Sequence, residues 1–272
     1  MRAPAGCQII RRLDAGGQVA FLRCKHNRLG DVCVIVAPSN TWPPWADPGL
    51  FERVPPHPTI VRLYESVYGI GEQRQYDAVV VEWTDGQTLQ ELVEHEGPLP
   101  IDRAAHISQQ VCDALLYVKV GIPLASGELL PCAHGHLGPR WVHVEDGGQV
   151  KLGGWGLFAL KPEDRDRRMR ERLMTVPPES ARGEQHEASY AQDVFGLGAI
   201  LHFALTGRGM YGDDYSLDAL VPLLRSGRVM LDPSLPMNAG RAIASLTAPK
   251  PADRPTLEQA NDLLLGLKST FE

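Results

Sequence analysis

The chain has 272 residues, of which 43% are hydrophobic and 22% are charged, and its formal net charge is −6 at pH 7. This length suits one large domain or two small ones with a sizeable core. The mild negative charge gives no general attraction to nucleic acid, so no nucleic-acid partner is expected. No apolar run reaches the roughly 18 residues that a membrane-spanning helix needs, so we expect no membrane insertion.

The cysteines and histidines point away from metal chemistry. The five cysteines are scattered, odd in number and never spaced as C-x-x-C, which argues against a disulfide framework or a zinc site and favours a cytoplasmic location. The nine histidines show no H-E-x-x-H spacing, so we expect neither a metal nor a cofactor. Many Arg, Ala, Gly and Pro residues would suit a GC-rich bacterial genome.

The first part of the chain is predicted to form strands, separated by turns rich in glycine and asparagine. These β-prone runs lie at 8–13, 18–25, 32–37, 60–68 and 77–83. Residues 39–49 contain three prolines that exclude a regular helix, which leaves only a turn or two of helix at 50–54.

After Gly86 the hydrophobic period changes from two to about 3.6, which predicts helices. They lie at 89–93, 101–118, 192–205, 217–225, 239–246 and 257–267, with two short strands at 141–144 and 149–152. Residues 123–131 look like a surface hairpin. Strands followed by helices predict one α+β domain, 1–272, with a small mostly-β lobe at 1–83 and a larger mainly helical lobe at 84–272.

Two motifs carry a resemblance to the protein kinases. The run H-G-H-L-G-P-R-W at 134–141 resembles the kinase catalytic loop, usually H-R-D-L-K-P-x-N, and V-K-L-G-G-W-G-L at 150–157 resembles V-K-L-x-D-F-G-L. Five more matches follow in family order, at 57–61, 80–89, 177–179, 192–198 and 251–256. The resemblance implies a bilobal protein kinase-like fold with a shortened αC region.

The resemblance also shows which positions depart from the family pattern. Kinase chemistry depends on positioning and charge neutralisation by a few groups. Those groups are replaced at the strand-3 lysine (Ile35), the proton acceptor (His136), the loop lysine (Gly138), the metal-binding asparagine (Trp141) and the metal-binding aspartate (Gly154). Gly154 offers no carboxylate to a hard cation, and Trp141 could instead fill the vacated space. These residues predict a pseudokinase that is not an enzyme.

Four other residues keep the family pattern, and the resemblance implies structural roles for them. Asp193 would hold the backbone of the catalytic loop, and His134 would pack beneath it. Glu179 and Arg254 would form a buried ion pair that ties the activation segment to the large lobe.

We therefore expect a catalytically inactive signalling module that acts as a scaffold or an allosteric regulator of a protein partner, an active kinase being one candidate. One alternative is a nucleotide sensor that binds ATP without metal at the hinge residues Glu82, Trp83 and Thr84, although nucleotide binding is expected to be weak or absent. A second alternative is an atypical phosphoryl or nucleotidyl transferase.

Two segments are candidate partner surfaces. Trp42 and Trp45 flank two prolines and could anchor a protein partner, or cap the short helix from inside. The charged run at 163–172 is either a solvated segment or a docking patch for an acidic partner, because arginine binds carboxylates and phosphates in a fork geometry. Its candidate residues are Arg167, Arg168, Arg170 and Arg172.

Overall fold

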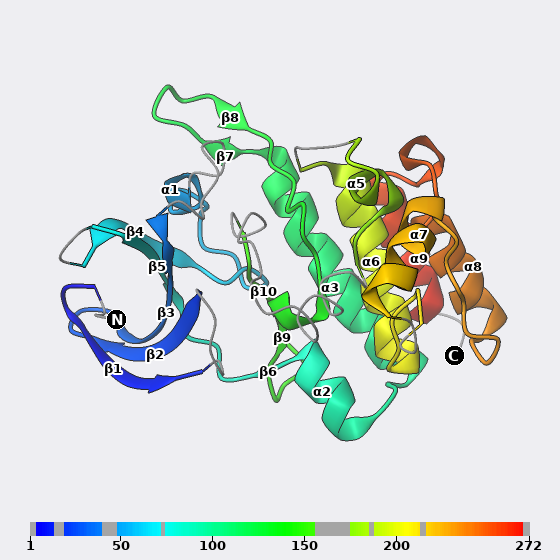
Figure 1. Cartoon of the computed structure of the whole chain (residues 1–272), viewed down its shortest axis with the longest axis horizontal. Coiled ribbons are helices and arrows are strands. Elements are labelled where there is room, and N and C mark those ends of the chain that lie inside the picture. Colours follow the sequence, from blue (N-terminus) through cyan, green and yellow to red (C-terminus); the bar gives the residue numbers. More distant parts are fainter. Residues whose placement is uncertain are drawn as a thin grey trace.

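A five-stranded antiparallel sheet forms one lobe of the molecule, and helices form the other (Figure 1). The structure is a computed structural model that describes residues 4–13, 19–39, 48–71, 74–155, 175–184, 188–212 and 216–268. In sheet order the strands are β1 (Cys7–Arg12), β2 (Ala20–His26), β3 (Gly30–Pro38), β5 (Tyr76–Glu82) and β4 (Leu63–Ile70). These are the five predicted strands, with ends shifted by a few residues.

The alternation of side chains gives this sheet two apolar faces. Leu22 and Cys24 of β2 pack with Val34 of β3 in a small core of the sheet's own. Phe21 of β2 and Ile35 of β3 are paired across the two strands and lie on the other face, which belongs to the main core shared with the large lobe. The β-branched residues of β3 therefore connect both cores.

Among the described residues, the backbone joins the lobes at two places. One is covalent, where β5 runs into β6 (Gln87–Thr88). The other is a backbone contact between the segment before β4 and β10 (Val150–Leu152): the Val61 N–H donates to the Leu152 carbonyl at 3.0 Å, and the Leu152 N–H donates to the Thr59 carbonyl at 2.8 Å. The helix described between β3 and β4 is α1 (Pro48–Phe51), which agrees with the predicted short αC region.

The large lobe contains every helix that the sequence predicts beyond residue 86. These are α2 (Leu89–Glu96), α3 (Ile101–Val120), α6 (Tyr190–Thr206), α7 (Leu217–Ser226), α8 (Met237–Leu246) and α9 (Leu257–Lys268). The pattern missed the short α5 (Pro178–Ala181) and two 3₁₀ turns, η2 (Pro139–Trp141) and η3 (Pro251–Asp253), because four residues or fewer carry no readable period.

Helix α6 is the centre of the large lobe. Ser189 and Gln192 form a capping box that fixes its first turn, and Gly207 ends it in the left-handed conformation at φ 68°. All twelve residues from 193 to 204 are buried, so α6 is covered on every side rather than on one stripe. Helices α3, α8 and α9 pack around it (Figure 1).

Two small sheets complete the large lobe. Strands β10, β9 (Val142–Val144) and β6 form one of them, which lies between the five-stranded sheet and the helices of the large lobe in Figure 1. Strands β7 (Ile122–Pro123) and β8 (Leu129–Leu130) form the other, which is the predicted surface hairpin. The α+β, two-lobe architecture predicted from the sequence is thus confirmed.

A buried ion pair ties α5 to the segment before α9. Arg254 donates from Nη1 to Glu179 Oε1 at 2.7 Å and from Nη2 to Glu179 Oε2 at 2.8 Å. Arg254 also donates to the Ala248 and Ala191 carbonyls, and its side chain has no exposed surface. Because every charged atom has a partner, this pair fixes three segments of the lobe together.

Removing one charge of this pair should destabilise the protein strongly. We expect Glu179→Gln to lower the free energy of unfolding by about 3–5 kcal/mol, since it leaves Arg254 buried opposite a neutral group. The measurement is urea unfolding at pH 7. The matched control is Glu96→Gln, which weakens the half-exposed pair with Arg103 and should cost less than about 1 kcal/mol. Equal losses for the two variants would contradict this account.

Candidate functional site

The loop at 134–141 is held by a carboxylate from α6. Asp193 accepts the backbone N–H of His134 at 2.8 Å and the backbone N–H of Gly135 at 2.7 Å. The His134 ring lies beneath the same loop, with Nε2 2.8 Å from the Gly153 carbonyl and Nδ1 accepting the His136 N–H at 3.3 Å. These contacts require a neutral ring protonated at Nε2, because Nδ1 must accept.

Burial sets the protonation of both anchors. Desolvation lowers the pKa of His134 to about 4, against the opposing effect of the Gly153 carbonyl, so the ring is neutral at pH 7. Desolvation raises the pKa of Asp193 to about 7, although the two N–H donors from the loop lower it. Near pH 7 the group of this anchor that titrates in the folded protein is therefore Asp193, because the His134 ring is already neutral there.

Of the five positions that depart from the kinase pattern, Ile35 lies in the small lobe and the other four lie in the large lobe. Ile35, a residue of β3, is buried in the main core, and His136 is half-buried in the loop at 134–141. Gly138 is buried, and a Cβ added there would lie 3.6 Å from Thr175 Oγ1. Trp141 and Gly154 are brought together directly: a Cβ added to Gly154 would lie 2.5 Å from Trp141 Cδ2, and Gly154 has φ +83°.

Trp141 spans the space between the lobes. Its ring centroid lies 6.2 Å from that of Phe21, which comes from β2 of the opposite lobe. Its indole N–H is buried and has no hydrogen-bond acceptor in the part of the chain that the structure describes. A buried donor without an acceptor lowers the free energy of unfolding by about 1–3 kcal/mol. The packing of the Trp141 ring must offset this cost.

The hinge residues make contacts with both lobes. Glu82 forms an ion pair with Lys151 of β10 at 2.7 Å, and the Trp83 ring lies 4.4 Å below the guanidinium of Arg23. Thr84 Oγ1 lies 3.0 Å from His143 Nδ1. Desolvation lowers the pKa of His143 to about 4, against the attraction of Glu91, so this ring is also neutral at pH 7.

Sequence reasoning missed these partners of the hinge. His143 lies between Val142 and Val144, which are buried, so the alternation of a strand places it on the opposite face. That alternation was a usable signal for His143. Arg23 and Lys151 had no such signal, because their contacts depend on how the two lobes meet.

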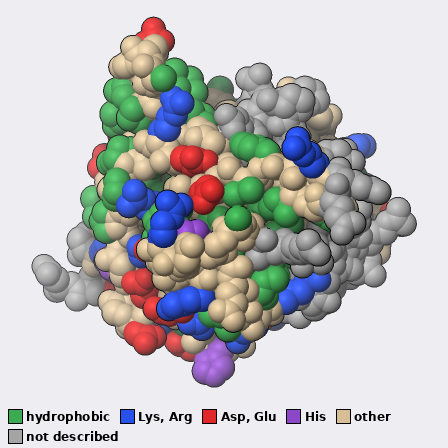
Figure 2. All heavy atoms as spheres, turned by 90° about the vertical axis from the view of Figure 1, so that its left-hand side faces the viewer, with side chains coloured by type: hydrophobic (Ala, Val, Ile, Leu, Met, Phe, Trp, Pro, Cys, Tyr) green, Lys and Arg blue, Asp and Glu red, His purple; other side chains and the backbone are tan. Residues whose placement is uncertain are grey.

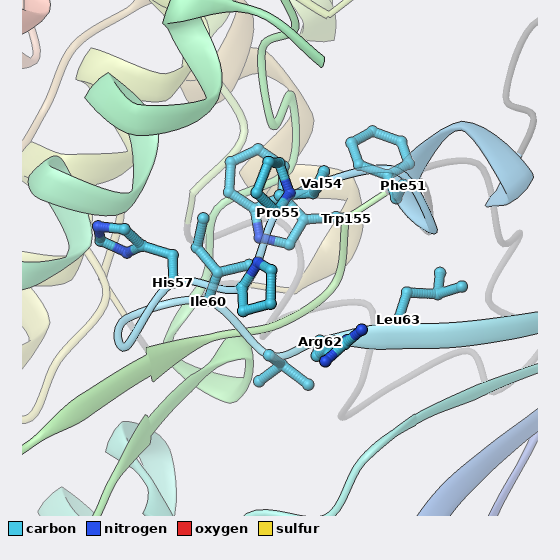
Figure 3. Close-up of a pocket in the computed structure, with 10 residues that line it drawn as sticks. Phe51, Val54, Pro55, His57, Ile60, Arg62, Leu63 and Trp155 are labelled. Atoms are coloured by element: carbon cyan, nitrogen blue, oxygen red, sulfur yellow. The ribbon is translucent and has the colours of Figure 1, made fainter. Parts of the chain in front are cut away.

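A small pocket opens beside Trp155, between α1 and the start of β4 (Figure 3). Trp155 is buried, lies 6.0 Å from Phe51 and 4.7 Å from His134 between ring centroids, and donates from Nε1 to the Leu152 carbonyl at 3.2 Å. The apolar lining includes Phe51, Val54, Pro55, Ile60, Leu63 and Trp155. The pocket therefore has an almost wholly apolar interior.

The candidate partner surfaces are not part of the described structure. Trp42 and Trp45 lie outside the described residues, and so do the four arginines of the charged run, Arg167, Arg168, Arg170 and Arg172. Within the described ranges no three His, Cys, Asp or Glu side chains are grouped closely enough to hold a metal ion. Among the helices described, none has the length and hydropathy to cross a bilayer.

Comparison with protein families gives a match over most of the chain. Residues 49–264 match the model of the protein tyrosine and serine/threonine kinases. The chain belongs to this family. The resemblance seen in the motifs is thereby confirmed.

Individual kinases extend the match. Serine/threonine-protein kinase PrkC of Bacillus subtilis is 25% identical over 222 residues, which are 79% of this chain and 32% of that protein. PkaA of Streptomyces coelicolor is 29% identical over 79% of this chain and 37% of that protein. This chain thus spans about a third of the length of these curated relatives. A crystal structure of Rad53 1-466 in complex with AMP-PNP superimposes with a TM-score of 0.73 at 22% identity, covering 97% of this chain and 65% of that one, which shows the fold.

These relatives contradict the prediction that the chain is not an enzyme. PrkC, PkaA and the probable PknB of Lactococcus lactis are named serine/threonine kinases, and the matching family is one of kinases, so the comparisons point to a kinase. The error was to infer lost activity from five positions alone. The residue types at five motif positions do not by themselves determine whether the chain transfers phosphoryl groups, because this activity also depends on groups elsewhere in the fold.

The contact between Trp141 and Gly154 can be tested by a double-mutant cycle. Gly154→Ala should destabilise the protein by about 2–4 kcal/mol, because its Cβ would overlap the Trp141 ring and its φ would be strained. In a Trp141→Ala background the overlap disappears, so the same change should cost only the strain, about 1–2 kcal/mol. Urea unfolding of the four proteins measures the coupling.

Gly153→Ala is the matched control for this cycle. Its added Cβ would meet no described atom nearer than 3.5 Å, so the cost should be small and unchanged by Trp141→Ala. Additive effects of Gly154→Ala and Trp141→Ala would show that the ring does not lie against this turn.

Asp193 should make stability fall as pH rises. Between the pKa of an unfolded aspartate, near 4, and its folded pKa of about 7, the folded protein holds a proton that the unfolded chain has lost. This contribution to the free energy of unfolding is complete below pH 4 and falls by up to about 1.4 kcal/mol per pH unit above it. Urea unfolding from pH 5 to 7 should therefore show a more negative slope for the wild type than for Asp193→Asn. Asp262→Asn, at an exposed position of α9, should keep the wild-type slope, and equal slopes for all three proteins would refute the assignment.

Proposed function

We propose that this chain acts in signalling as a kinase-family domain that regulates a protein partner by binding it. The family supplies the signalling context, since the curated relatives are serine/threonine kinases. Phosphoryl transfer, to which the names of the relatives point, is a separate property of the domain and is measured separately.

The observation that carries the proposal is the set of side-chain contacts across the lobe interface. Trp141 meets Phe21, Thr84 meets His143, and Glu82 meets Lys151. Each contact holds a residue of the sheet or of the hinge against the large lobe. A surface that spans two lobes is useful for recognition when the lobes keep one relative position, because less ordering is needed on binding.

The framework beneath the loop supports the same proposal. Asp193 and the Glu179–Arg254 pair fix the loop and α5 from below, and both are buried. The loop and α5 are therefore both anchored on buried polar contacts of the large lobe, which supports a recognition surface of fixed shape.

Metal-free nucleotide binding is a second candidate, favoured by one observation. The indole N–H of Trp141 is a buried donor that finds no acceptor among the described residues. A nucleotide oxygen or ring nitrogen at the lobe interface would satisfy it.

The decisive experiment measures binding and transfer with one preparation. The whole chain is titrated by calorimetry with a serine/threonine kinase of the same organism, and the rate of that kinase toward a peptide is followed in parallel. We expect saturable binding and at least a threefold change in rate. The absence of both effects with every such kinase would overturn the proposal.

Two further arms separate the alternatives. Transfer of labelled γ-phosphate by the chain alone, lost in His136→Ala, would make it a kinase in its own right. A rise in melting temperature with ATP in EDTA, reduced in Trp141→Phe, would favour the nucleotide sensor, because that variant keeps the ring and removes only the N–H.

A further inference from the structure

The last side chain of α9 contacts α3 through neutral groups. Lys268 lies with its Nζ 2.9 Å from His106 Nδ1 and donates to Gln109 Oε1 at 2.8 Å. Both partners belong to α3, so this amine joins the end of the last helix to the longest helix of the large lobe.

These neutral partners distinguish Lys268 from other basic side chains of the protein. On the face shown in Figure 2, several Lys and Arg side chains lie next to Asp and Glu side chains. Lys25 forms an ion pair with Asp31 at 2.8 Å, and Lys119 forms one with Glu258 at 2.6 Å. A carboxylate favours the charged form of a lysine, whereas a hydrogen-bond donor directed at the amine favours the uncharged form.

Backbone groups of the β9–β10 turn set the tautomer of His106. The buried Gln110 donates from Nε2 to the Gly148 carbonyl at 2.9 Å, and its Oε1 accepts the Val150 N–H at 2.9 Å. These two bonds fix the orientation of the amide, so its Nε2 is also the group that faces His106 Nε2, 3.1 Å away. A neutral imidazole has one acceptor nitrogen, so Nε2 accepts from the amide and Nδ1 carries the hydrogen.

The tautomer of His106 in turn sets the form of Lys268 that fits the site. The Nδ1 hydrogen is directed at Lys268 Nζ, which can accept it only as an uncharged amine. Gln109 is oriented by its donation to Asp113 Oδ2 at 2.6 Å, so its Oε1 is the atom that faces Nζ. Nζ therefore meets one donor and one acceptor, a pattern that suits an amine with a lone pair better than an ammonium group.

Burial acts in the same direction as the hydrogen bonds. Lys268 is half-buried, and desolvation lowers its pKa, against the attraction of the Asp113 carboxylate. Desolvation and the charge of Lys268 lower the pKa of His106, again against Asp113, so the ring is neutral at pH 7. The remaining ionisable neighbour is His57, whose charge acts on Asp113. A half-buried amine of this kind is still accessible to a small reagent.

We propose that Lys268 is a modification site, at which its uncharged amine takes the acyl group of a small activated donor, an acyl phosphate or an acyl thioester. Nζ forms the new bond to the acyl carbon, the bond from that carbon to oxygen or sulfur breaks, and the leaving group keeps its electron pair. One proton of Nζ passes to the solvent. The amide that results has no lone pair for the Nδ1 hydrogen of His106, so acylation weakens the contact between α9 and α3. This inference does not depend on the proposed function.

Acetylation of the whole chain by acetyl phosphate, followed residue by residue with peptide mass spectrometry from pH 7 to 10.5, tests the proposal. At pH 7 Lys268 should react at least about threefold faster than the exposed Lys250. The midpoint of its rate–pH profile should lie at least about one unit below the value of about 10.4 for a free lysine side chain. A small acetyl thioester is the second arm, and the reagent that prefers Lys268 identifies the class of donor.

Two variants test whether the hydrogen bonds cause this reactivity. His106→Ala removes the ring that faces Nζ, and Gln110→Glu replaces the N–H that faces His106 with an acceptor, so Nδ1 becomes free to accept from the ammonium group. Both should move the midpoint toward about 10.4 and lower the rate at pH 7 at least about threefold. The matched control is His95→Ala, at an exposed histidine of α2, which should change neither value.

Urea unfolding checks that each variant folds, and the exposed position of His106 makes His106→Ala the safer of the two. Equal rates at Lys268 and Lys250 with both reagents, or a midpoint that His106→Ala leaves in place, would show that Lys268 is an ordinary surface amine.

Discussion

The carboxylate of Asp193 is the interaction on which the interface between the lobes depends. It stands on the most enclosed helix of the protein and accepts two consecutive N–H groups from the loop at 134–141. That loop carries His134, which in turn supports the turn at 153–154 through the Gly153 carbonyl. Three polar contacts thus connect the centre of the large lobe to the turn at 153–154, against which the Trp141 ring packs. Because these contacts share one loop, we expect the loss of Asp193 to weaken the others.

The fold was predictable from the sequence where the pattern is long enough to be periodic. The valines of β3 and the apolar stripe of α3 repeat over several residues, and both elements are present close to their predicted positions. Strand β6 and helix α5 have two and four residues, and their geometry comes from neighbours rather than from their own sequence. The capping box of Ser189 explains why α6 begins before its first predicted residue.

The sequence motifs predicted which positions of the chain form the site, but not which side chains contact one another there. The motifs place Trp141 and Gly154 at the correct points of the chain, and the suggestion that Trp141 fills vacated space is compatible with its contact with Phe21. Two side-chain partners of the hinge, Arg23 and Lys151, could not be predicted, because their contacts depend on how the two lobes meet. The step from altered positions to an absent activity was the weakest, and the relatives contradict it. The contacts show which side chains occupy the interface between the lobes. They do not measure the rate of phosphoryl transfer.

The backbone contact between residues 59–61 and β10 has a mechanical consequence. Together with the covalent crossing after β5, it fixes the small lobe to the large one at two separate points. A rigid body held at two points keeps one degree of freedom, a rotation about the line that joins them. Any opening of the lobes is therefore a rotation of the small lobe about this line. The ring pairs Phe21–Trp141 and Phe51–Trp155 belong to neither attachment point, so such a rotation would separate them.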